Sequence, residues 1–330
     1  MAILRKRADV QVTVWPEDRT CERDWLLSNI AGADGVIVLF TDKINAELLE
    51  RAGPQLKVVS TMSVGYDHVS LGELYKRKVR LGYTPDVLTD AVADLSVMLA
   101  LMAGRNGGAG ITLVKDGQWP EFAPFFMCGP QLSSSSLAPT RTAGFLGFGR
   151  IAQATLKRVA AFGVTHCIYS GNPSSPPDTA LEVHLAEDHR LQSVRRVDLD
   201  VLARESDVLF VLAPGGEKTY HVIDEKFLRK MRRHSVLVNT ARGTLVDSDA
   251  LAMALREEWI WGAGLDVVEG EPNVGAGHPL VKEPRCVIVP HIGSATWETR
   301  VDMATLAAKN LLAGLSAESM PAELDLASRV

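Results

Sequence analysis

Residues 143–152 read AGFLGFGRIA, a short apolar run that passes through Gly147 and Gly149 into a helical pattern. Glycine at the first position permits a tight turn, and glycine at the second lets the backbone approach a pyrophosphate. A small residue such as Ala152 then allows close packing of helix on strand. A second apolar run, Thr165–Tyr169, completes a strand, helix and strand. The stretch predicts a Rossmann-type dinucleotide site. Its predicted cofactor contacts are Gly147, Gly149, Arg150 and Ile151.

The loop after Tyr169 reads SGNPSS and bears on the choice of cofactor. An NAD site normally places Asp or Glu here, where the carboxylate binds the adenosine ribose hydroxyls and would repel a 2′-phosphate. No acid is present, so the sequence favours NADP(H), with NAD(H) possible. The cations that could meet the phosphate are Arg150, Arg195 and Arg196. The predicted contacts in this loop are Gly171, Asn172, Pro173 and Ser174.

Three later apolar runs each end in a loop that carries one reactive side chain. Arg242 lies in NTARG, Glu271 in GLDVVEGEP and His291 in PHIGSAT. They supply a fixed cation, an imidazole and a carboxylate able to keep that imidazole protonated, which suits proton transfer to oxygen beside an anionic group. Each alone has a structural explanation, as a strand cap, a turn residue or a buried histidine. Their joint position at strand ends favours a site that reduces 2-oxoacids.

The segment before residue 83 alternates short β-branched runs with helical patterns, which predicts a small parallel α/β sheet. The expected strands are Val10–Val14, Gly35–Leu39, Lys57–Ser60 and Val79–Gly82, and the expected helices include Asn45–Arg51 and Leu71–Arg77. The third run leads into TMSVGYDH, where Ser63, Val64 and Gly65 could present backbone N–H groups to an anion. An ordinary strand-to-helix turn is the alternative.

The middle of the chain predicts a long apolar helix over Leu88–Arg105, buried between domains or against a second subunit, and a flexible break at Gly107–Gly110. An aromatic loop follows, which could line a pocket, even a neighbour's, or pack into its own domain. Its aromatic residues are Trp119, Phe122, Phe125 and Phe126. Residues 133–141 then form a polar insert, expected to be a mobile surface loop.

Further strand and helix patterns continue the doubly wound arrangement toward the C-terminus. The expected strands are Asp207–Ala213, Ser235–Thr240, Gly262–Val267 and Cys286–Pro290. The expected helices are Asp224–Arg232, Asp247–Glu257 and a closing helix over Glu298–Leu315.

Composition excludes several other classes of protein. A chain of 330 residues exceeds the usual size of one core, so two domains are expected. The net charge is -5 and the basic residues are scattered, which argues against nucleic acid. The four cysteines show neither disulfide nor zinc-ligand spacing, so no metal is expected. No signal peptide or long apolar run is visible, which predicts a cytoplasmic protein with no membrane contact.

With these residues quoted, the chain resembles the D-isomer-specific 2-hydroxyacid dehydrogenases, and most of all the glyoxylate/hydroxypyruvate reductases. The segments that carry the resemblance are STMSVGYDH, GYTPDVLTD, GFGRIA, NTARG, GLDVVEGEP, HPL and PHIGSAT. The resemblance implies a two-domain α/β fold that forms homodimers. Residues 1–87 with 298–330 would form a smaller flavodoxin-like substrate-binding domain, and residues 88–297 a Rossmann-type doubly wound NAD(P)-binding domain.

The resemblance also implies roles for individual residues. Arg242 would grip the substrate carboxylate and ketone, His291 would act as general acid, and Glu271 would orient and charge His291. Val64 and Gly65 would offer backbone N–H groups to the carboxylate, with Asp266 and Ser294 supporting the site. Further implied cofactor contacts are Pro214, Thr240, Asp266 and Gly293.

The expected reaction is NADPH-dependent reduction of glyoxylate to glycolate and of hydroxypyruvate to D-glycerate. Alternatives are a phosphoglycerate or D-lactate dehydrogenase, and a non-catalytic cofactor sensor of the same fold. The preference between glyoxylate and hydroxypyruvate depends on the volume of the pocket, and hence on how Met62, Trp119 and Phe122 pack. Phe122 stands where the reductases of this subgroup tend to have a Trp. Relative to the resemblance the chain starts late and lacks the first strand and helix expected before Val10, and the 133–141 insert has no counterpart in the family. An inactive product of a truncated gene is therefore a further alternative.

Overall fold

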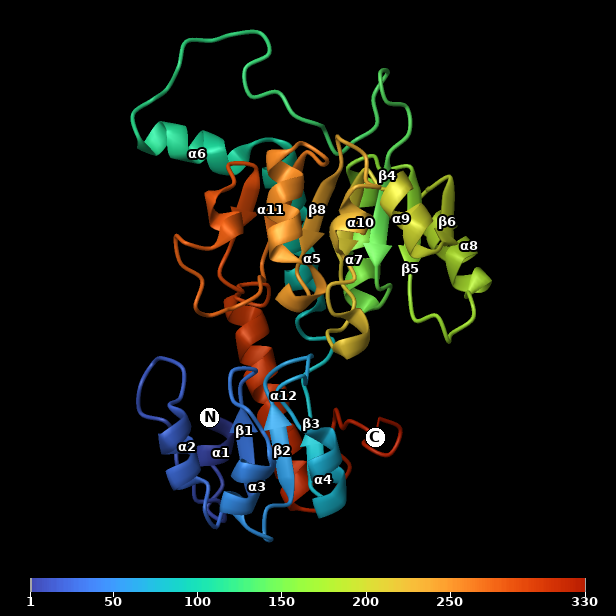
Figure 1. Cartoon of the computed structure of the whole chain (residues 1–330). Coiled ribbons are helices and arrows are strands. Elements are labelled where there is room, and N and C mark those ends of the chain that lie inside the picture. The colour runs from blue at the N-terminus through green and yellow to red at the C-terminus, as the bar shows by residue number, and fades with distance from the viewer. Residues whose placement is uncertain (1, 330) are drawn as a thin grey trace. The chain divides into compact units, whose positions relative to one another are not determined.

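The computed structural model describes residues 2–329, which form two α/β units (Figure 1). The split unit contains the residues up to Leu88 and those from Ser294 onward. The central unit is the continuous segment Thr89–Gly293. Each unit has its own parallel sheet, which confirms the predicted α/β class.

The sheet of the split unit has three parallel strands in the order β1-β2-β3. They are β1 (Gly35–Val38), β2 (Val58–Thr61) and β3 (Arg80–Gly82), and the helices are α1 (Ala2–Arg5), α2 (Arg23–Asn29), α3 (Ala46–Ala52), α4 (Leu71–Arg77) and α12 (Trp297–Leu315). Successive side chains of the central strand point to opposite faces. Val59 packs with Leu48 of α3, whereas Val58 packs with Ala308 and Leu311 of α12. The sheet is therefore covered by helices on both faces.

The strand predicted over Val10–Val14 is wrong. Residues 10–15 have no strand pairing within the described chain, and the sheet begins at β1. Val12 packs at the side of the cluster that contains Val58 and Leu311. Alternating apolar and polar residues indicate only that one side of an extended segment is buried. A segment that lies on a core has the same pattern even when no neighbouring strand is hydrogen-bonded to it.

The sheet of the central unit has seven parallel strands in the order β10-β9-β8-β7-β4-β5-β6. They are β4 (Thr142–Leu146), β5 (His166–Ser170), β6 (Ser193–Arg196), β7 (Val208–Val211), β8 (Val236–Asn239), β9 (Gly262–Leu265) and β10 (Cys286–Ile288). The strand order reverses between β4 and β7, as in a Rossmann-type sheet, and ligands bind at the carboxyl ends beside such a reversal. The predicted doubly wound fold is confirmed.

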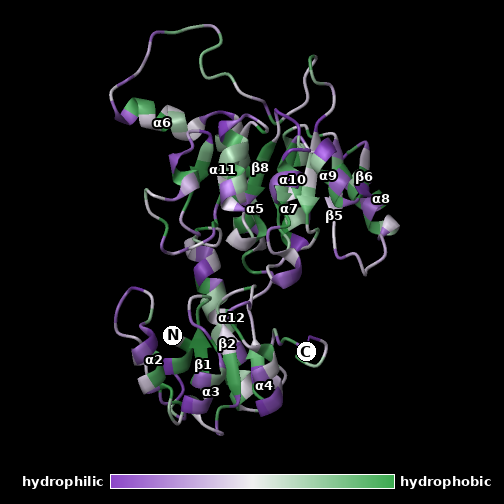
Figure 2. Ribbon diagram, in the orientation of Figure 1, coloured by the Kyte–Doolittle hydropathy of each residue, from purple (hydrophilic) through white to green (hydrophobic). Residues whose placement is uncertain are grey.

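Helices cover both faces of this sheet. One face packs against α5 (Thr89–Gly104), α7 (Arg150–Ala161) and α8 (Thr179–Asp188), and the other against α9 (Leu199–Glu205), α10 (Glu225–Leu228) and α11 (Ser248–Arg256). Short 3-10 turns are η1 (Glu217–Thr219), η2 (Gly243–Leu245) and η3 (Pro279–Lys282). Phe145 and Phe210 stack on the first face, and Leu209 lies on the second. Figure 2 shows the strands mostly in the colour of hydrophobic residues. The helix expected over Asp224–Arg232 is shorter, since it ends at Leu228.

Helix α5 is buried within its own unit, where it packs on β8, β9 and α7. A Cβ atom at Gly264 would lie 2.7 Å from the carbonyl oxygen of Leu99, so the glycine permits this close approach. The long apolar circumference of the helix thus reflects its position on the sheet. Met98 of this helix is nevertheless 41% exposed, and the location between domains or against a second subunit stays a prediction.

The flexible break predicted at Gly107–Gly110 is wrong, because these glycines begin helix α6 (Gly107–Lys115). Asn106, with φ 53°, turns the chain after α5 and lets a second helix start. Among residues 2–329 no single helix is long and apolar enough to cross a bilayer. Helices α5 and α6 meet that test only together, across a bend of 70°.

After α6 the chain makes a long arch without helix or strand before it enters β4 (Figure 1). Trp119, Phe122 and Phe125 are 79%, 92% and 88% exposed. The alternative in which this aromatic loop packs into its own domain is therefore wrong. The 133–141 insert lies at the surface, as predicted, and is anchored by the bond from Ser134 N to Gly163 O, at 3.2 Å.

Candidate active site

Arg242, Glu271 and His291 follow β8, β9 and β10 respectively, which are neighbouring strands of the central sheet. Because the strands are parallel, all three loops leave from the carboxyl edge. The dinucleotide loop after β4 leaves from the same edge. The structure therefore brings the predicted reactive residues to the edge where a doubly wound sheet binds its ligands.

His291 and Glu271 face one another across two loops. The imidazole Nδ1 lies 3.3 Å from Glu271 Oε1, and both side chains are partly buried. His291 has φ 53°, in the left-handed region, and its backbone N–H donates to the Asp266 carbonyl at 2.9 Å. The carboxylate at Nδ1 and the backbone bond together fix the position of the ring.

Asp266 is a buried carboxylate that fixes the loop carrying His291. Its oxygens accept the N–H groups of Ile292 at 2.6 Å and Gly293 at 2.9 Å. Burial raises the pKa of Asp266 above its ordinary value, although these two N–H groups oppose the shift. A Cβ at Gly293 would lie 2.9 Å from Asp266 Oδ2, so the glycine leaves room for the bond. The structure thus places these two predicted site residues in contact.

Arg242 leaves the sheet just after the buried Asn239. The Asn239 amide caps the turn: its Nδ2 donates to Arg242 O at 2.9 Å and its Oδ1 accepts from Ala241 N at 3.0 Å. A Cβ at Gly243 would lie 2.2 Å from the carbonyl carbon of Val268. The loops after β8 and β9 therefore touch at a point that only glycine permits, which fixes the Arg242 loop against the Glu271 loop.

His221 joins these loops, and sequence reasoning missed it. Its backbone N–H donates to Thr244 O at 2.9 Å, just after Arg242, and its Nε2 lies 2.9 Å from Glu269 Oε2, just before Glu271. The ring of Tyr220 stacks on it at 3.9 Å. The sequence signal was a histidine in the loop that follows β7, together with a second acid in DVVEGEP.

The loop after β4 has the geometry of a dinucleotide cradle. Gly147 has φ 85°, donates its N–H to Ser170 O at 2.7 Å, and would place a Cβ 2.7 Å from Ala213 N. At Gly149 a Cβ would meet open space, at the start of the 12-residue helix α7. Arg150 and Ile151 form the first turn of that helix. An exposed helix start behind a glycine turn fits a pyrophosphate, so a nicotinamide dinucleotide suits these residues.

The predicted contacts at Gly171, Asn172, Pro173 and Ser174 form a loop, exposed from Asn172 onward, after β5. Arg196 of β6 reaches this loop, with Nη2 2.6 Å from Asn172 O and a second bond from Nη1 to Ser175 O. Arg195 turns away and pairs with Glu205. Of the two adjacent arginines, the structure places only Arg196 beside the loop. Pro214 follows β7, and Thr240 follows β8 within 2.8 Å of Ser96 Oγ.

Val64, Gly65 and Ser294 belong to the split unit. The Val64–Gly65 turn follows β2 and is shaped by Ser63, whose hydroxyl donates to Gly65 O at 2.6 Å and lies 2.7 Å from Thr61 Oγ1. Ser294 precedes α12. Among residues 2–329 no group of three or more His, Cys, Asp or Glu side chains could hold a metal ion.

Comparison with known proteins places this geometry in a family. Residues 97–293 match the D-isomer specific 2-hydroxyacid dehydrogenase, NAD binding domain. The glyoxylate reductase/hydroxypyruvate reductase of Mus musculus is 41% identical over 325 residues, which cover 98% of this chain and 94% of the mouse protein.

Solved structures agree over most of the chain. A protein of Thermus thermophilus has a TM-score of 0.82 at 37% identity and covers 98% of this chain and 95% of its own. The NADPH-dependent glyoxylate/hydroxypyruvate reductase of Sinorhizobium meliloti, solved with NADP and malonate, has a TM-score of 0.72 at 32% identity, covering 88% and 84%. The strand order, the glycine cradle and these matches agree: the chain belongs to the D-isomer specific 2-hydroxyacid dehydrogenase family.

Proposed function

We propose that the protein reduces short 2-oxoacids, glyoxylate to glycolate and hydroxypyruvate to D-glycerate, with NAD(P)H. The observation that carries the proposal is the His291–Glu271 pair, at 3.3 Å, on the same sheet edge as Arg242 and the dinucleotide cradle. A proton donor, a fixed cation and a cofactor site are what reduction of a 2-oxoacid requires. The names of the mouse and S. meliloti relatives support the choice of substrates.

In this proposal each residue acts on one part of the substrate. Arg242 holds the carboxylate through the two parallel donors of its guanidinium. A bound nicotinamide cofactor supplies the hydride that reduces the carbonyl carbon. His291 gives its Nε2 proton to the carbonyl oxygen, and Glu271 holds the ring in place at Nδ1 and stabilises its charged form. Asp266 keeps the His291 loop in position through Ile292 and Gly293.

The remaining site residues divide between the two units. We assign substrate binding to residues 1–87 with 298–330, where Val64 and Gly65 offer backbone N–H groups to the carboxylate. Ser294, which precedes α12, supports the site. We assign cofactor binding to residues 88–297. Its proposed contacts are Gly147, Gly149, Arg150, Ile151, Gly171, Asn172, Pro173, Ser174, Pro214, Thr240, Asp266 and Gly293.

We further propose that NADPH is preferred over NADH. No carboxylate follows β5 within SGNPSS, and Arg196 already has both terminal nitrogens at the Asn172–Ser175 turn. A guanidinium beside this loop supplies the charge that a 2′-phosphate needs. The S. meliloti relative, described as NADPH-dependent, supports this choice, whereas the matched family domain is described as NAD binding.

The protein is also proposed to form homodimers. The arch after α6 leaves Trp119, Phe122 and Phe125 largely exposed, and Ile111 and Val114 of α6 are exposed as well. Large apolar groups gathered on a surface mark interaction sites, and aromatic residues are enriched at interfaces. A second copy of the chain is the partner that this proposal assigns to them.

The test measures oxidation of NADPH or NADH by its absorbance, with hydroxypyruvate and then glyoxylate as substrate. We expect turnover with both substrates and a higher kcat/KM with NADPH. His291→Asn should lower kcat by about 100- to 10,000-fold, the usual contribution of a general acid, while binding of NADPH is retained. Absence of turnover in the folded wild-type protein would instead favour a cofactor sensor, and near-normal turnover in His291→Asn would exclude His291 as the acid.

A further inference from the structure

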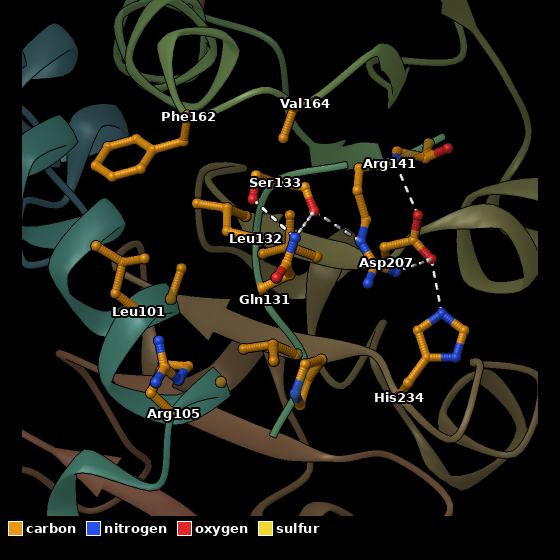
Figure 3. Close-up of a pocket in the computed structure, with 16 residues that line it drawn as sticks. Leu101, Arg105, Gln131, Leu132, Ser133, Arg141, Phe162, Val164, Asp207 and His234 are labelled. Atoms are coloured by element: carbon orange, nitrogen blue, oxygen red, sulfur yellow. Dashed lines mark hydrogen bonds and ion pairs between the residues drawn. The ribbon is translucent and has the colours of Figure 1, made fainter. Parts of the chain in front are cut away.

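A cavity lies at the amino ends of the central strands, whereas the proposed active site lies at their carboxyl ends. Figure 3 shows the residues that line it. It opens at the amino ends of β4, β7 and β8, beside the last turn of α5 and the loop at residues 130–133. Its volume is about 270 Å³. The walls are mainly apolar, with Leu101, Leu132, Phe162 and Val164 among the lining residues. Most of a small organic molecule could be removed from water here.

The carboxylate in the lining is already satisfied. Asp207 accepts bonds from Thr142 N at 2.8 Å, Arg232 Nη1 at 2.7 Å and His234 Nε2 at 2.8 Å. Arg232 balances its charge, and three donors occupy both oxygens. Asp207 therefore offers little to a ligand and is shielded from repelling an anion.

Arg141 is the opposite case, a nearly buried cation with weak partners. Its side chain is 13% exposed, its Nε lies 3.4 Å from Ser133 O, and its Nη1 lies 3.9 Å from Asp207 Oδ1. A guanidinium carries five N–H donors, and these two distances are long for hydrogen bonds. Figure 3 shows Arg141 at the cavity wall between Ser133 and Asp207. Arg105, an exposed residue, is a second arginine in the lining, whereas Asp207 is a carboxylate that is already paired.

We propose that this cavity binds an organic monocarboxylate with an apolar body about the size of a benzene ring. The carboxylate pairs with Arg141, and the apolar body lies against Leu101, Leu132 and Phe162. Size supports the assignment, because an engineered cavity of about 150 Å³ holds benzene, which leaves room here for a ring and a carboxylate. Charge supports it as well, since a carboxylate accepts two parallel bonds from a guanidinium.

The site is separate from the catalytic edge and does not depend on the proposed reaction. The two ends of β4, Thr142 and Leu146, are on the order of 13 Å apart at the usual rise of a strand. A ligand in the cavity and a dinucleotide at Gly147 can therefore bind at the same time. The 133–141 insert forms part of the wall through Ser133 and Arg141.

The experiment titrates 4-fluorophenylacetate into the full-length protein and follows its ¹⁹F signal. Because the proposed active site also holds a carboxylate, Arg242→Met serves to remove binding there. We expect a Kd of about 1 mM or lower for a ligand of this size, unchanged in Arg242→Met. Arg141→Met should weaken binding about 10- to 100-fold, the effect of a charged hydrogen bond. Arg195→Met is the matched control, because it removes an arginine from β6 outside the cavity.

Two further measurements keep the result clear if Arg141→Met folds poorly. Leu132→Trp should fill the cavity and abolish binding, and the neutral 4-fluorophenylacetamide should bind at least about 10-fold more weakly than the acid. Turnover of 2-oxoacids should stay within about 2-fold of wild type in Arg141→Met, because Arg141 lies at the opposite end of β4 from the catalytic edge. Binding that is lost in Arg242→Met, retained in Leu132→Trp, or absent in the wild type up to about 10 mM would overturn the proposal.

Discussion

Arg196 illustrates how the fate of a single residue depends on which face of a strand it occupies. Neighbours on a strand point to opposite faces, so Arg195 and Arg196 diverge at the end of β6. Arg195 meets Glu205, and Arg196 meets the turn after β5, the strand next to it in the sheet. The contact of Arg196 with the loop proposed to bind the 2′-phosphate is therefore fixed by the register of β6 against β5.

Arg196→Met should raise KM for NADPH by about 10- to 100-fold, because a charge-assisted contact to phosphate is lost. KM for NADH should change little, since NADH lacks the 2′-phosphate. Steady-state kinetics with both cofactors check this, and Arg195→Met, one residue away on the other face, should leave both values near wild type. Equal losses for NADPH and NADH would mean that Arg196 only supports the loop.

At this scale, the sequence predicts residues whose position follows from their own loop. Arg242, Glu271 and His291 each follow an apolar run, so their place at a strand end could be read locally. Arg195 and Arg196 could not be separated, because the sequence pattern does not reveal which face of β6 each side chain occupies. His221 was missed because its partner Glu269 is 48 residues away and pairs with it only once the strands are ordered.

At the scale of elements, His221 holds together the loops that follow β7, β8 and β9. Its backbone bond to Thr244 is independent of the side chain, whereas its ring pairs with Glu269 at 2.9 Å. The Nδ1 atom lies 3.8 Å from Asp247, which caps α11. The ring therefore acts on the Glu271 loop through Glu269, as a positioning residue.

His221→Ala should lower kcat by about 3- to 10-fold, the effect of one partly buried hydrogen bond, with little change in the binding of NADPH. His221→Gln, whose amide can still donate to Glu269, should recover most of the loss. The comparison of kcat with the Kd for NADPH in both variants checks this role. A fall in thermal stability with unchanged kcat would show that the contact is structural only.

At the opposite ends of the same strands, Asp207 links β4, β7 and the segment before β8. Burial alone would raise the pKa of Asp207, but bonds from His234, Thr142 and Arg232 outweigh it and hold the pKa below its ordinary value. Folding therefore weakens proton binding at this group, so its stabilisation is present above the unfolded value of about 3.9 and is lost as the pH falls through the lower folded value.

Asp207→Asn should destabilise the protein by about 1 to 3 kcal/mol at neutral pH, because Arg232 and His234 lose a carboxylate partner. Thermal unfolding of both proteins, followed from pH 7 downward, should show the difference shrinking below about pH 4. Asp200→Asn is the control, since Asp200 forms exposed pairs with Lys230 and Arg204 that contribute little. A difference that persists unchanged at acid pH would contradict the role of the charge.

Sequence reasoning placed correctly those elements whose residue pattern is compatible with only one kind of secondary structure. An apolar run before a glycine turn gave β4, and helical period after it gave α7. Val10–Val14 failed because alternation cannot distinguish a paired strand from an extended segment on a core. Helix α6 was missed because the three glycines near its start have low helix propensity. The helix forms because Asn106 turns the chain before it and Ile111–Lys115 continue it with better helix formers.

At the scale of the whole molecule, the fold class could be predicted because each unit repeats strand and helix in alternation. The surface of one chain carries a further kind of information that the sequence left open. An aromatic loop can pack into the core of its own domain or against the surface of another protein, and the amino-acid composition of the loop is the same in both cases. Only the exposure of Phe122 and Phe125 decides between them, and it leaves these rings outside the core of their own unit.

The double variant Phe122→Ser with Phe125→Ser should convert the proposed dimer to a monomer. Aromatic side chains at the centre of an interface contribute about 2 kcal/mol or more each, so their joint loss should weaken association at least about 100-fold. Sedimentation velocity at micromolar concentration checks the change in mass, and Leu137→Ser, at another exposed apolar residue of the same region, is the matched control. Both rings are exposed in the single chain, so the double substitution should not destabilise the fold of the monomer itself. A wild-type protein that sediments as a monomer, or a double variant that remains dimeric, would show that these rings serve another purpose than self-association.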